Sequence, residues 1–336
     1  MSLVEEKSKK LLETAFEYLA SDIHFYPVNE YTNIYFRVHG SRLFYKKISK
    51  STYDLLLAYY KFTSGMDIGN TRKPQDGTIN YSGKHSKYSL RLSTLPLSQA
   101  ESLAIRILPQ ETNLQLHNLL LFPAQLKVLK RWITHRAGLI LLTGPTGSGK
   151  STTLYALLED ILKDNSYQTI TLEDPIEKDL NHILQVQVNE KAGITYQTGL
   201  KAALRHDPDI IMIGEIRDKD TAHFAFEAAL TGHLVLSTLH AKDAVGTVYR
   251  LIEMGLDPFE LQQFLIAVAA VQLIPIKINN QVTRRAATLE LLEGKLLEKV
   301  LQGGEINDQD NFQTFYHLRK KAYAYGFISK KTLNKS

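Results

Sequence analysis

The chain has 336 residues, a length that favours two domains. Its composition, 44% hydrophobic and 22% charged, is that of an ordinary globular protein, and its formal net charge of +5 comes from scattered lysines and arginines. Cysteine is absent, which excludes disulfides, a thiol nucleophile and a cysteine-ligated zinc. Because no basic block is interleaved with aromatic residues, we expect no direct binding to nucleic acid.

The sequence shows neither a secretory signal nor a membrane span. Residues 1–10 are charged, and no apolar core follows them. The longest apolar stretch, 264–276, contains Gln272 and Pro275 and falls short of the roughly 20 residues that span a bilayer. We therefore expect a cytoplasmic protein that reaches the membrane through a partner.

Residues 1–107 mix helical and strand patterns, which predicts a small α+β domain. A second helix is expected from Ser51 or Thr52, its caps, to Gly65. Pro74-Gln75-Asp76-Gly77 has the composition of a turn. Helical stripes or strands are expected at 11–19, 21–25, 33–38, 42–45, 78–81, 88–95 and 104–108.

Two histidines and two arginines of residues 1–107 show no functional pattern on their own. His24 and His39 are isolated from other metal-ligand types, so structural or surface roles are expected. Arg91 and Arg106 lie in expected strands, where an arginine usually faces solvent. Residues 108–120 carry little pattern and predict a linker, with a second domain at 121–336.

The strongest motif is Gly144-Pro145-Thr146-Gly147-Ser148-Gly149-Lys150-Ser151, which matches the phosphate-binding pattern G-x-x-x-x-G-K-S. An apolar run at 139–143 precedes it and predicts a buried strand. Apolar residues at helical spacing follow it, so the strand–loop–helix context of the motif is present. Glycines let the loop amides approach phosphate, Lys150 can reach the β and γ phosphates, and the Ser151 hydroxyl can ligate Mg²⁺. The motif predicts nucleotide binding.

Two acidic residues follow expected strands of this second domain. Glu173 stands at the end of the strand 169–172, where it can act on a water or a metal near the γ-phosphate; the alternative is a solvated acidic turn. Glu215 follows the apolar run 210–213 and Gly214, a pattern that presents a carboxylate to Mg²⁺. Arg217 and Asp218 follow closely and could form a structural ion pair.

Two histidines flank the next expected strand. His233 and His240 are seven residues apart, which as extended chain spans over 20 Å, so they cannot share one metal or one phosphate. A turn after Thr238 would bring His240 to the nucleotide end. Asp257-Pro258-Phe259-Glu260 predicts a helix start, with the helix continuing through Val268. A strand is expected at 282–292 and helix from Leu296.

Four blocks together resemble the assembly ATPases of type II secretion and type IV pilus systems: GPTGSGKSTTLYA, TLEDPIE, DPDIIMIGEIRD and TGHLVLSTLHA. SDIHFYP, RVHG, KPQDGTI, RLSTLP and AIRIL in the first domain match too. The subgroup that the chain resembles most is the competence pseudopilus ATPases of Gram-positive bacteria. Three departures from the larger relatives favour it: an extra N-terminal domain and a four-cysteine motif are missing, and Gln272-Leu273-Ile274-Pro275 replaces a Q-R-L run. The C-terminal signature of retraction motors is also missing, which favours assembly.

This resemblance implies an α/β fold: a RecA-like P-loop ATPase core with a smaller α+β, PAS-like N-terminal domain. It implies a homo-hexamer that uses ATP and Mg²⁺ and works with a polytopic inner-membrane platform protein. Residues expected to bind ATP are Gly144, Pro145, Thr146, Gly147, Ser148, Gly149, Lys150, Ser151 and Thr152, and Ser151 and Glu215 are expected to hold Mg²⁺.

The same resemblance assigns catalytic roles. Glu173 would orient or activate the attacking water, while His233 and His240 would sense the nucleotide state. Arg91 and Arg106 match arginines of the first domain that reach the nucleotide, so closure of the two domains would accompany hydrolysis.

Three functions remain open from the sequence. The leading one is a motor that hydrolyses ATP to assemble a pseudopilus for DNA uptake, or the related motor of type II secretion. A DNA-translocating RecA-like ATPase is the second. The third is a nucleotide-gated scaffold without turnover, which the joint presence of Lys150, Glu173 and Glu215 disfavours.

Overall fold

The computed structural model describes residues 3–84, 86–98, 100–110, 115–164, 167–278 and 281–334. The chain divides into two compact units: Met1–Asn113 with Glu177–Asp179, and Leu114–Ile176 with Leu180–Ser336. The linker expected at 108–120 lies partly outside the described residues, at 111–114, and a short helix, α3 (Leu116–Leu119), occupies part of the rest.

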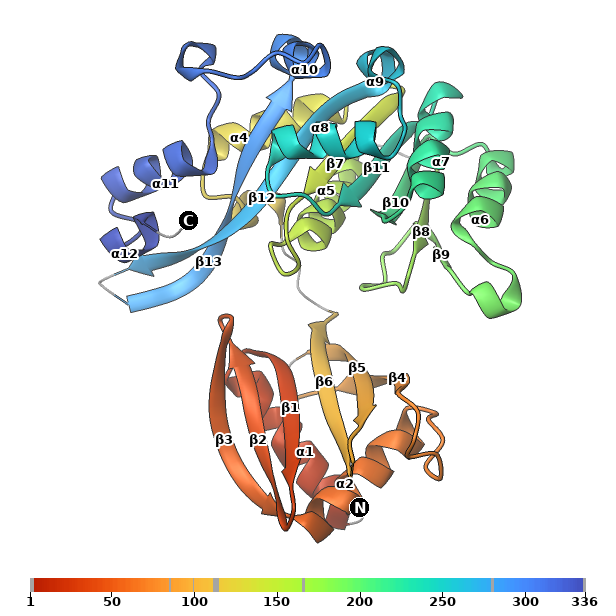
Figure 1. Ribbon diagram of the computed structural model, residues 1–336, viewed down its shortest axis with the longest axis vertical. Coiled ribbons are helices and arrows are strands. Elements are labelled where there is room, and N and C mark those ends of the chain that lie inside the picture. Colours follow the sequence, from red (N-terminus) through yellow and green to blue (C-terminus); the bar gives the residue numbers. More distant parts are fainter. Residues whose placement is uncertain are drawn as a thin grey trace. The chain divides into compact units, whose positions relative to one another are not determined.

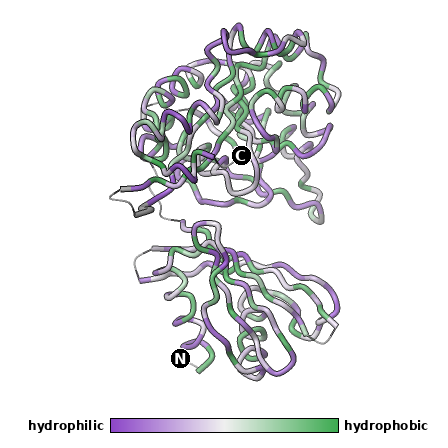
Figure 2. The backbone as a smooth tube through the Cα atoms, turned by 60° about the vertical axis from the view of Figure 1, so that its left-hand side comes forward, coloured by the Kyte–Doolittle hydropathy of each residue, from purple (hydrophilic) through white to green (hydrophobic). Residues whose placement is uncertain are grey.

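The first unit is an antiparallel sheet of order β3-β2-β1-β6-β5-β4, with two helices on one face (Figure 1). Alternate side chains of the inner strands β2, β5 and β6 are buried against these helices, whereas the edge strands β3 and β4 have no buried side chains. Figure 2 shows the hydropathy of each residue along the backbone of this unit. Its elements are α1 (Leu3–Glu17), β1 (Ala20–Val28), β2 (Tyr31–Val38), β3 (Ser41–Ser49), α2 (Lys50–Thr63), β4 (Gln75–Ser82), β5 (Lys87–Pro96) and β6 (Glu101–Pro109).

Two local expectations for this unit are wrong. The N-cap of α2 is Ser49, whose hydroxyl oxygen accepts a hydrogen bond from the Thr52 amide. The helix begins at Lys50, before the first apolar residue of its pattern. Gln75 to Gly77 are not a turn, since β4 begins at Gln75. Gly77 is needed for close packing instead: a Cβ there would lie 2.6 Å from the carbonyl oxygen of Ser64 at the end of α2.

The second unit is built on a sheet of order β13-β12-β7-β11-β10-β8-β9, in which β13 alone of the described strands runs antiparallel to its neighbour (Figure 1). Its strands are β7 (Gly138–Thr143), β8 (Thr169–Glu173), β9 (Leu184–Gln187), β10 (Ile210–Ile216), β11 (Leu234–Leu239), β12 (Leu265–Ile278) and β13 (Gln281–Glu293). Helices cover both faces, so the central strands β7 and β11 are buried throughout.

The helices of the second unit fall into two layers and a C-terminal group. One layer comprises α3, α4 (Pro123–Trp132) and α5 (Lys150–Asp164). The other layer comprises α6 (Tyr196–Ala203), α7 (Lys219–Leu230), α8 (Ala244–Glu253), α9 (Pro258–Phe264) and α10 (Gly294–Leu301). The C-terminal group, α11 (Phe315–Ala324) and α12 (Lys330–Leu333), packs on the ends of β12 and β13. Short 3₁₀ turns lie at Glu190–Ala192, Leu204–His206 and Asp308–Asp310.

The helix expected to run through Val268 ends at Phe264, and this expectation is wrong. Leu265 and Val268 belong to β12, where they pair with Leu139 and Leu141 of β7. A strand buried on both faces is a continuous apolar run, which has no strand-like alternation to distinguish it from a helix. Within the described ranges, no helix has the length and apolar character of a bilayer span.

Candidate functional site

The loop between β7 and α5 has a conformation that only glycine allows at key positions. Gly144 has φ 142° and Gly149 has φ 96°, both in the region that side chains disfavour. A Cβ on Gly144 would lie 2.7 Å from the carbonyl oxygen of Val271 and equally close to the Ser148 hydroxyl. The loop therefore packs closely on itself and on β12, and it leads into the N-terminus of α5.

Two polar side chains at the loop could bind an anion. The Lys150 ammonium group is buried and donates to the carbonyl oxygens of Gly144 at 2.8 Å and Pro145 at 3.2 Å. The Ser148 hydroxyl oxygen is buried without a hydrogen-bond partner. An unpaired buried hydroxyl is costly, and a phosphate would satisfy it together with the loop amides. The residues present therefore fit a nucleotide phosphate.

Hydroxyl groups tie the carboxyl ends of three neighbouring strands together. Thr143 of β7 donates to the Leu239 carbonyl oxygen at 2.9 Å, and Thr238 of β11 donates to the Gly214 carbonyl oxygen at 2.8 Å. These bonds hold the carboxyl ends of β7, β11 and β10 in fixed register. The side chains that follow these strands therefore meet at the same edge of the sheet.

Lys150, Glu215 and His240 come together at this edge. The Nε2 atom of His240 lies 2.7 Å from a carboxylate oxygen of Glu215, and its Nδ1 atom lies 3.5 Å from the Lys150 Nζ. Because a lysine ammonium only donates, Nδ1 accepts and the ring proton is on Nε2, which donates to Glu215. The turn expected after Thr238 is not found: β11 runs through Leu239, and His240, the next residue, lies at the phosphate loop.

Arg217 extends this network to the acidic turn. Its Nε donates to Glu215 at 3.0 Å and its Nη1 donates to Asp174 at 2.9 Å. The hydrogen bond to Glu215 raises the pKa of Arg217 further, so the guanidinium stays charged. Asp218, expected as its ion-pair partner, instead caps α7 by accepting the Thr221 amide at 2.8 Å.

Glu173 is buried at the end of β8 rather than exposed in a turn. Its carboxylate accepts hydrogen bonds from the hydroxyl groups of Tyr155 and Thr171 and from the Gln185 amide at 3.1 Å. Tyr155 lies on α5, the helix that follows the phosphate loop, so Glu173 is anchored beside that helix.

His233 lies at the opposite end of β11 from His240. Its Nδ1 lies 3.0 Å from the Thr231 hydroxyl and 3.2 Å from the Ala228 carbonyl oxygen. The structure therefore groups His240 with the phosphate loop. His233 lies at the start of the strand and contacts residues at the C-terminal end of α7.

Arg91 and Arg106 are direct cross-strand partners on the uncovered face of the first unit. Arg106 donates to Asp22 at 3.1 Å. His24 lies on the same face, and its pKa is lowered by burial, with Arg37, Arg42 and Arg106 adding to the effect and Asp22 opposing it. This face concentrates positive charge.

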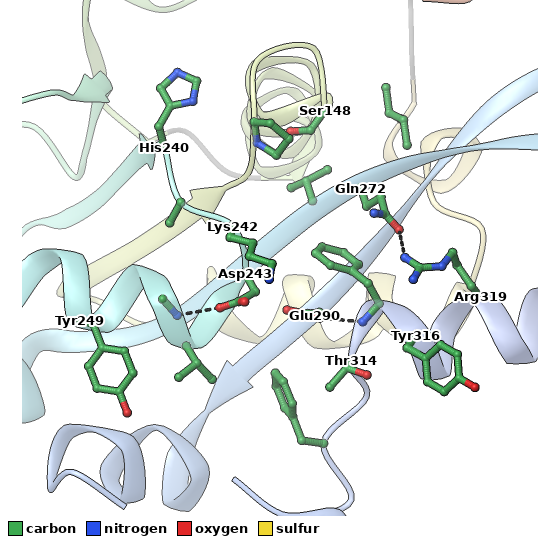
Figure 3. A pocket seen from close by; sticks show the side chains of 18 of the residues that line it. Ser148, His240, Lys242, Asp243, Tyr249, Gln272, Glu290, Thr314, Tyr316 and Arg319 are labelled. Carbon is green, nitrogen blue, oxygen red and sulfur yellow. Dashed lines mark hydrogen bonds between the residues drawn. The ribbon is translucent and has the colours of Figure 1, made fainter. Parts of the chain in front are cut away.

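A cavity of about 1460 Å³ lies beside the phosphate loop (Figure 3). One wall is the loop itself, Pro145 to Ser148, and another is the segment from His240 to the start of α8. β12 and β13 contribute Gln272 and Glu290, and the C-terminal group contributes Arg319. Arg319 donates to the Gln272 side-chain oxygen at 3.0 Å.

Burial raises the pKa of Glu290 on this cavity wall, although two backbone hydrogen bonds and Arg319 oppose the shift. A magnesium ion would find hard oxygen donors in Ser151 and Glu215, which suit that metal. Among the described residues, no preformed cluster of three histidine, aspartate or glutamate ligands exists, so phosphate and water would have to complete the coordination.

The strand–loop–helix motif on a largely parallel sheet, with helices on both faces, defines a P-loop ATPase of RecA-like architecture. The chain belongs to the family "Type II/IV secretion system protein", whose model matches residues 1–308. The expected resemblance and the α/β fold class are confirmed.

Relatives cover most of the chain. Competence protein ComGA of Bacillus subtilis (strain 168) is 43% identical over 343 residues, 98% of this chain and 96% of that protein. Type II secretion system ATPase E of Vibrio cholerae is 43% identical over 256 residues, 76% of this chain and 51% of that protein.

Two solved structures share the fold. The pilus retraction motor PilT with bound ADP has a TM-score of 0.72 and 26% identity, covering 99% of this chain and 96% of that one. The Legionella pneumophila ATPase DotB has a TM-score of 0.78 at 23% identity, covering 97% of this chain and 94% of that one. The chain is therefore a protein of the secretion and pilus ATPase class.

Sequence reasoning missed the partners that hold the acidic groups. Gln185 binds Glu173 and Glu290 lines the cavity, yet neither belongs to a recognisable motif. Tyr155, which also binds Glu173, lies at the end of the block GPTGSGKSTTLYA, but nothing in the block indicates that contact. For Asp174 and Arg217 a signal existed, because both lie next to the acidic residues within the blocks that carry the resemblance.

Proposed function

We propose that the chain is an ATP-hydrolysing motor that drives assembly of a type IV-like pseudopilus for DNA uptake. The observation that carries the proposal is the meeting of Lys150, His240 and Glu215 at the phosphate loop. The similarity to ComGA over nearly the full length of both chains supports the competence role, whereas similarity to type II secretion ATPases leaves that system as the alternative.

In this proposal the loop from Gly144 to Ser151, with Thr152, binds the phosphates of ATP. Lys150 exchanges its loop carbonyls for the β and γ phosphates and neutralises charge as the terminal bond breaks. Ser151 and Glu215 hold Mg²⁺, which supplies charge neutralisation when bound. Glu173 orients the attacking water, whose oxygen bonds to the γ-phosphorus as the bond to the β-phosphate oxygen breaks.

His240 reports the state of this site in the proposal. It contacts both the lysine that binds phosphate and the carboxylate that holds the metal, so loss of the γ-phosphate changes both of its neighbours. His233 contributes indirectly, through the other end of the same strand. This refines the expectation that both histidines sense nucleotide.

Arg91 and Arg106 contribute charge from the first unit. An arginine that reaches the transferring phosphoryl group raises the rate by about 10³–10⁵ in other systems. Because these arginines and Glu215 belong to different units, turnover would require the units to close, and closure would provide the mechanical step. Unchanged turnover in both Arg91→Ala and Arg106→Ala would contradict this assignment.

We further propose a homo-hexamer at the cytoplasmic face of the membrane, docked on a polytopic platform protein and without direct contact to nucleic acid. The relatives named for secretion and pilus systems support this setting.

The test is steady-state ATP hydrolysis by the purified chain with and without Mg²⁺. We expect Mg²⁺-dependent turnover that Glu215→Gln abolishes while ATP binding persists, and loss of binding in Lys150→Ala. ATP binding without turnover by the wild type under every condition would favour the scaffold and contradict the proposal.

A further inference from the structure

Glu290 is a buried carboxylate with an unusual pair of partners. It lies on β13 in the wall of the cavity and is 3% exposed. One carboxylate oxygen accepts the backbone amide of Phe315 at 2.6 Å, and the other accepts the backbone amide of Ala244 at 3.3 Å. The two oxygens thus serve two segments far apart in the sequence.

Both amides belong to the first residues of helices. Ala244 begins α8, after its cap Asp243, and Phe315 begins α11, after its cap Thr314. First-turn amides have no partner within their own helix, and the helix dipole favours a negative charge there. One carboxylate therefore fixes the starts of both helices against β13.

The start of α8 is directly connected to the nucleotide site. His240, which donates to Glu215 and faces Lys150, precedes Ala244 by only a short loop that lines the cavity. Any shift of the α8 start therefore moves the backbone that carries His240. α11 lies beyond residues 1–308, the part that the family model matches.

The chemistry requires an ionised carboxylate. Glutamine at this position would offer one acceptor oxygen, and its NH₂ group would face a second N–H donor. Asp243 and Arg319, the charged groups near Glu290, have opposite effects, and Arg319 stabilises the ionised form from α11 itself.

We infer that Glu290 is a positioning residue for the nucleotide site: through the start of α8 it sets the position of His240, and through α11 it makes the C-terminal helices part of the same hydrogen-bonded unit. The catalytic part of this inference depends on the proposed ATP hydrolysis. Its structural part, the joint anchoring of α8 and α11, does not.

The test compares four variants of the full chain: Glu290→Gln, Ala244→Pro, the double variant and Glu298→Gln. Proline is tolerated at a first helical position, and Asp243 has the extended backbone that proline requires before it, so Ala244→Pro removes the donor and keeps the helix start. Its ring also adds carbon atoms at a fully buried position, so a thermal melt of this variant accompanies the comparison. Glu298 is exposed on α10 and provides the matched loss of charge.

We expect Glu290→Gln to lower kcat by roughly tenfold to a hundredfold with KM for ATP changed by less than about twofold. Ala244→Pro should have a similar effect, and the double variant should be no worse than the more affected single variant, since both remove one interaction. Glu298→Gln should match the wild type. The catalytic part would be overturned if the double variant lowered kcat by the product of the two single effects. It would also be overturned if the kcat of Glu290→Gln equalled that of Glu298→Gln.

Hydrogen exchange separates this inference from the proposed function. In Glu290→Gln, whatever the ATPase activity, amides at 241–246 and 313–318 should both exchange faster than in Glu298→Gln, with β10 unchanged. Unaltered exchange at either segment would overturn the joint anchoring. A wild type that binds ATP but never hydrolyses it would instead contradict the proposed function.

Discussion

The direction of the hydrogen bonds at the nucleotide site follows from which groups can only donate. Lys150 donates to His240, and Arg217 donates to Glu215 and to Asp174. A continuous set of contacts thus runs from Lys150 through His240, Glu215 and Arg217 to Asp174. Each member holds its neighbour in one orientation, and removing an inner member would release both sides.

Arg217 tests whether these contacts orient the site, because it contacts neither the phosphate loop nor any residue proposed to bind phosphate. We expect Arg217→Ala to lower kcat by roughly tenfold to a hundredfold, since Glu215 loses the donor that orients it. Steady-state ATPase assays would measure the effect, with Arg205→Ala, an exposed arginine of the same unit, as the control. Equal kcat in both variants would show that Arg217 has no positioning role.

His24 should make the first unit sensitive to mild acid. Its folded-state pKa lies below the ordinary value of about 6.5, so the unfolded chain binds the proton more readily. The stability that depends on neutral His24 is present above about pH 6.5 and is lost as the pH falls towards the folded pKa.

Thermal unfolding between about pH 7.5 and 5.5 would measure this dependence. We expect the wild-type melting temperature to fall over that window and His24→Asn to show a smaller fall. The same slope in both proteins would rule out His24 as its source.

At the scale of elements, the first unit contains a buried ion pair that ties a helix to the sheet. Lys61 near the end of α2 and Glu101 at the start of β6 are 2.8 Å apart, and their side chains are 2% and 3% exposed. Lys61 also donates to the Asn70 carbonyl oxygen at 2.9 Å, and the Tyr53 hydroxyl donates to the Glu101 carbonyl oxygen at 2.6 Å. The pair thus holds α2, β6 and the loop before β4 together.

Breaking this pair from one side leaves a buried charge. We expect Glu101→Ala to lower the free energy of unfolding by about 3–5 kcal/mol, and Lys61→Met added to it to recover a large part of the loss. Urea unfolding of the two variants and the wild type would measure this. A double variant as unstable as Glu101→Ala would mean that the lost contacts, rather than the uncompensated lysine, cause the effect.

The sequence predicted those elements whose signal is local. The strand at 139–143, the phosphate loop and the strand at 282–292 were all predicted, because period, glycine placement and motif spacing lie within a few neighbouring residues. The apolar pattern predicts a helix where β12 begins, since burial on both faces removes the alternation that identifies strands.

Contacts between distant segments could not be predicted. The donors to Glu173 and the two helix starts on Glu290 come from segments whose approach depends on the packed sheet. The packing role of Gly77 likewise depends on where α2 ends. Such roles appear only once tertiary packing is known.

At the scale of the whole molecule, the candidate site residues lie on two separate units of the chain. One contains the phosphate loop and its acidic and histidine partners, and the other presents an arginine-bearing sheet face. The family match covers the first unit and the second unit up to residue 308. In the proposed mechanism, closure of these units would act on a partner: a membrane platform protein for an assembly motor, DNA for a translocase.

The most direct measurement is therefore ATP hydrolysis by the wild type, Glu173→Gln and Glu215→Gln, each assayed alone, with DNA, and with membranes that contain a candidate platform protein. Our account predicts that only the membranes stimulate turnover and that both variants lose the stimulation. Stimulation by DNA and not by membranes would contradict it and favour a DNA translocase.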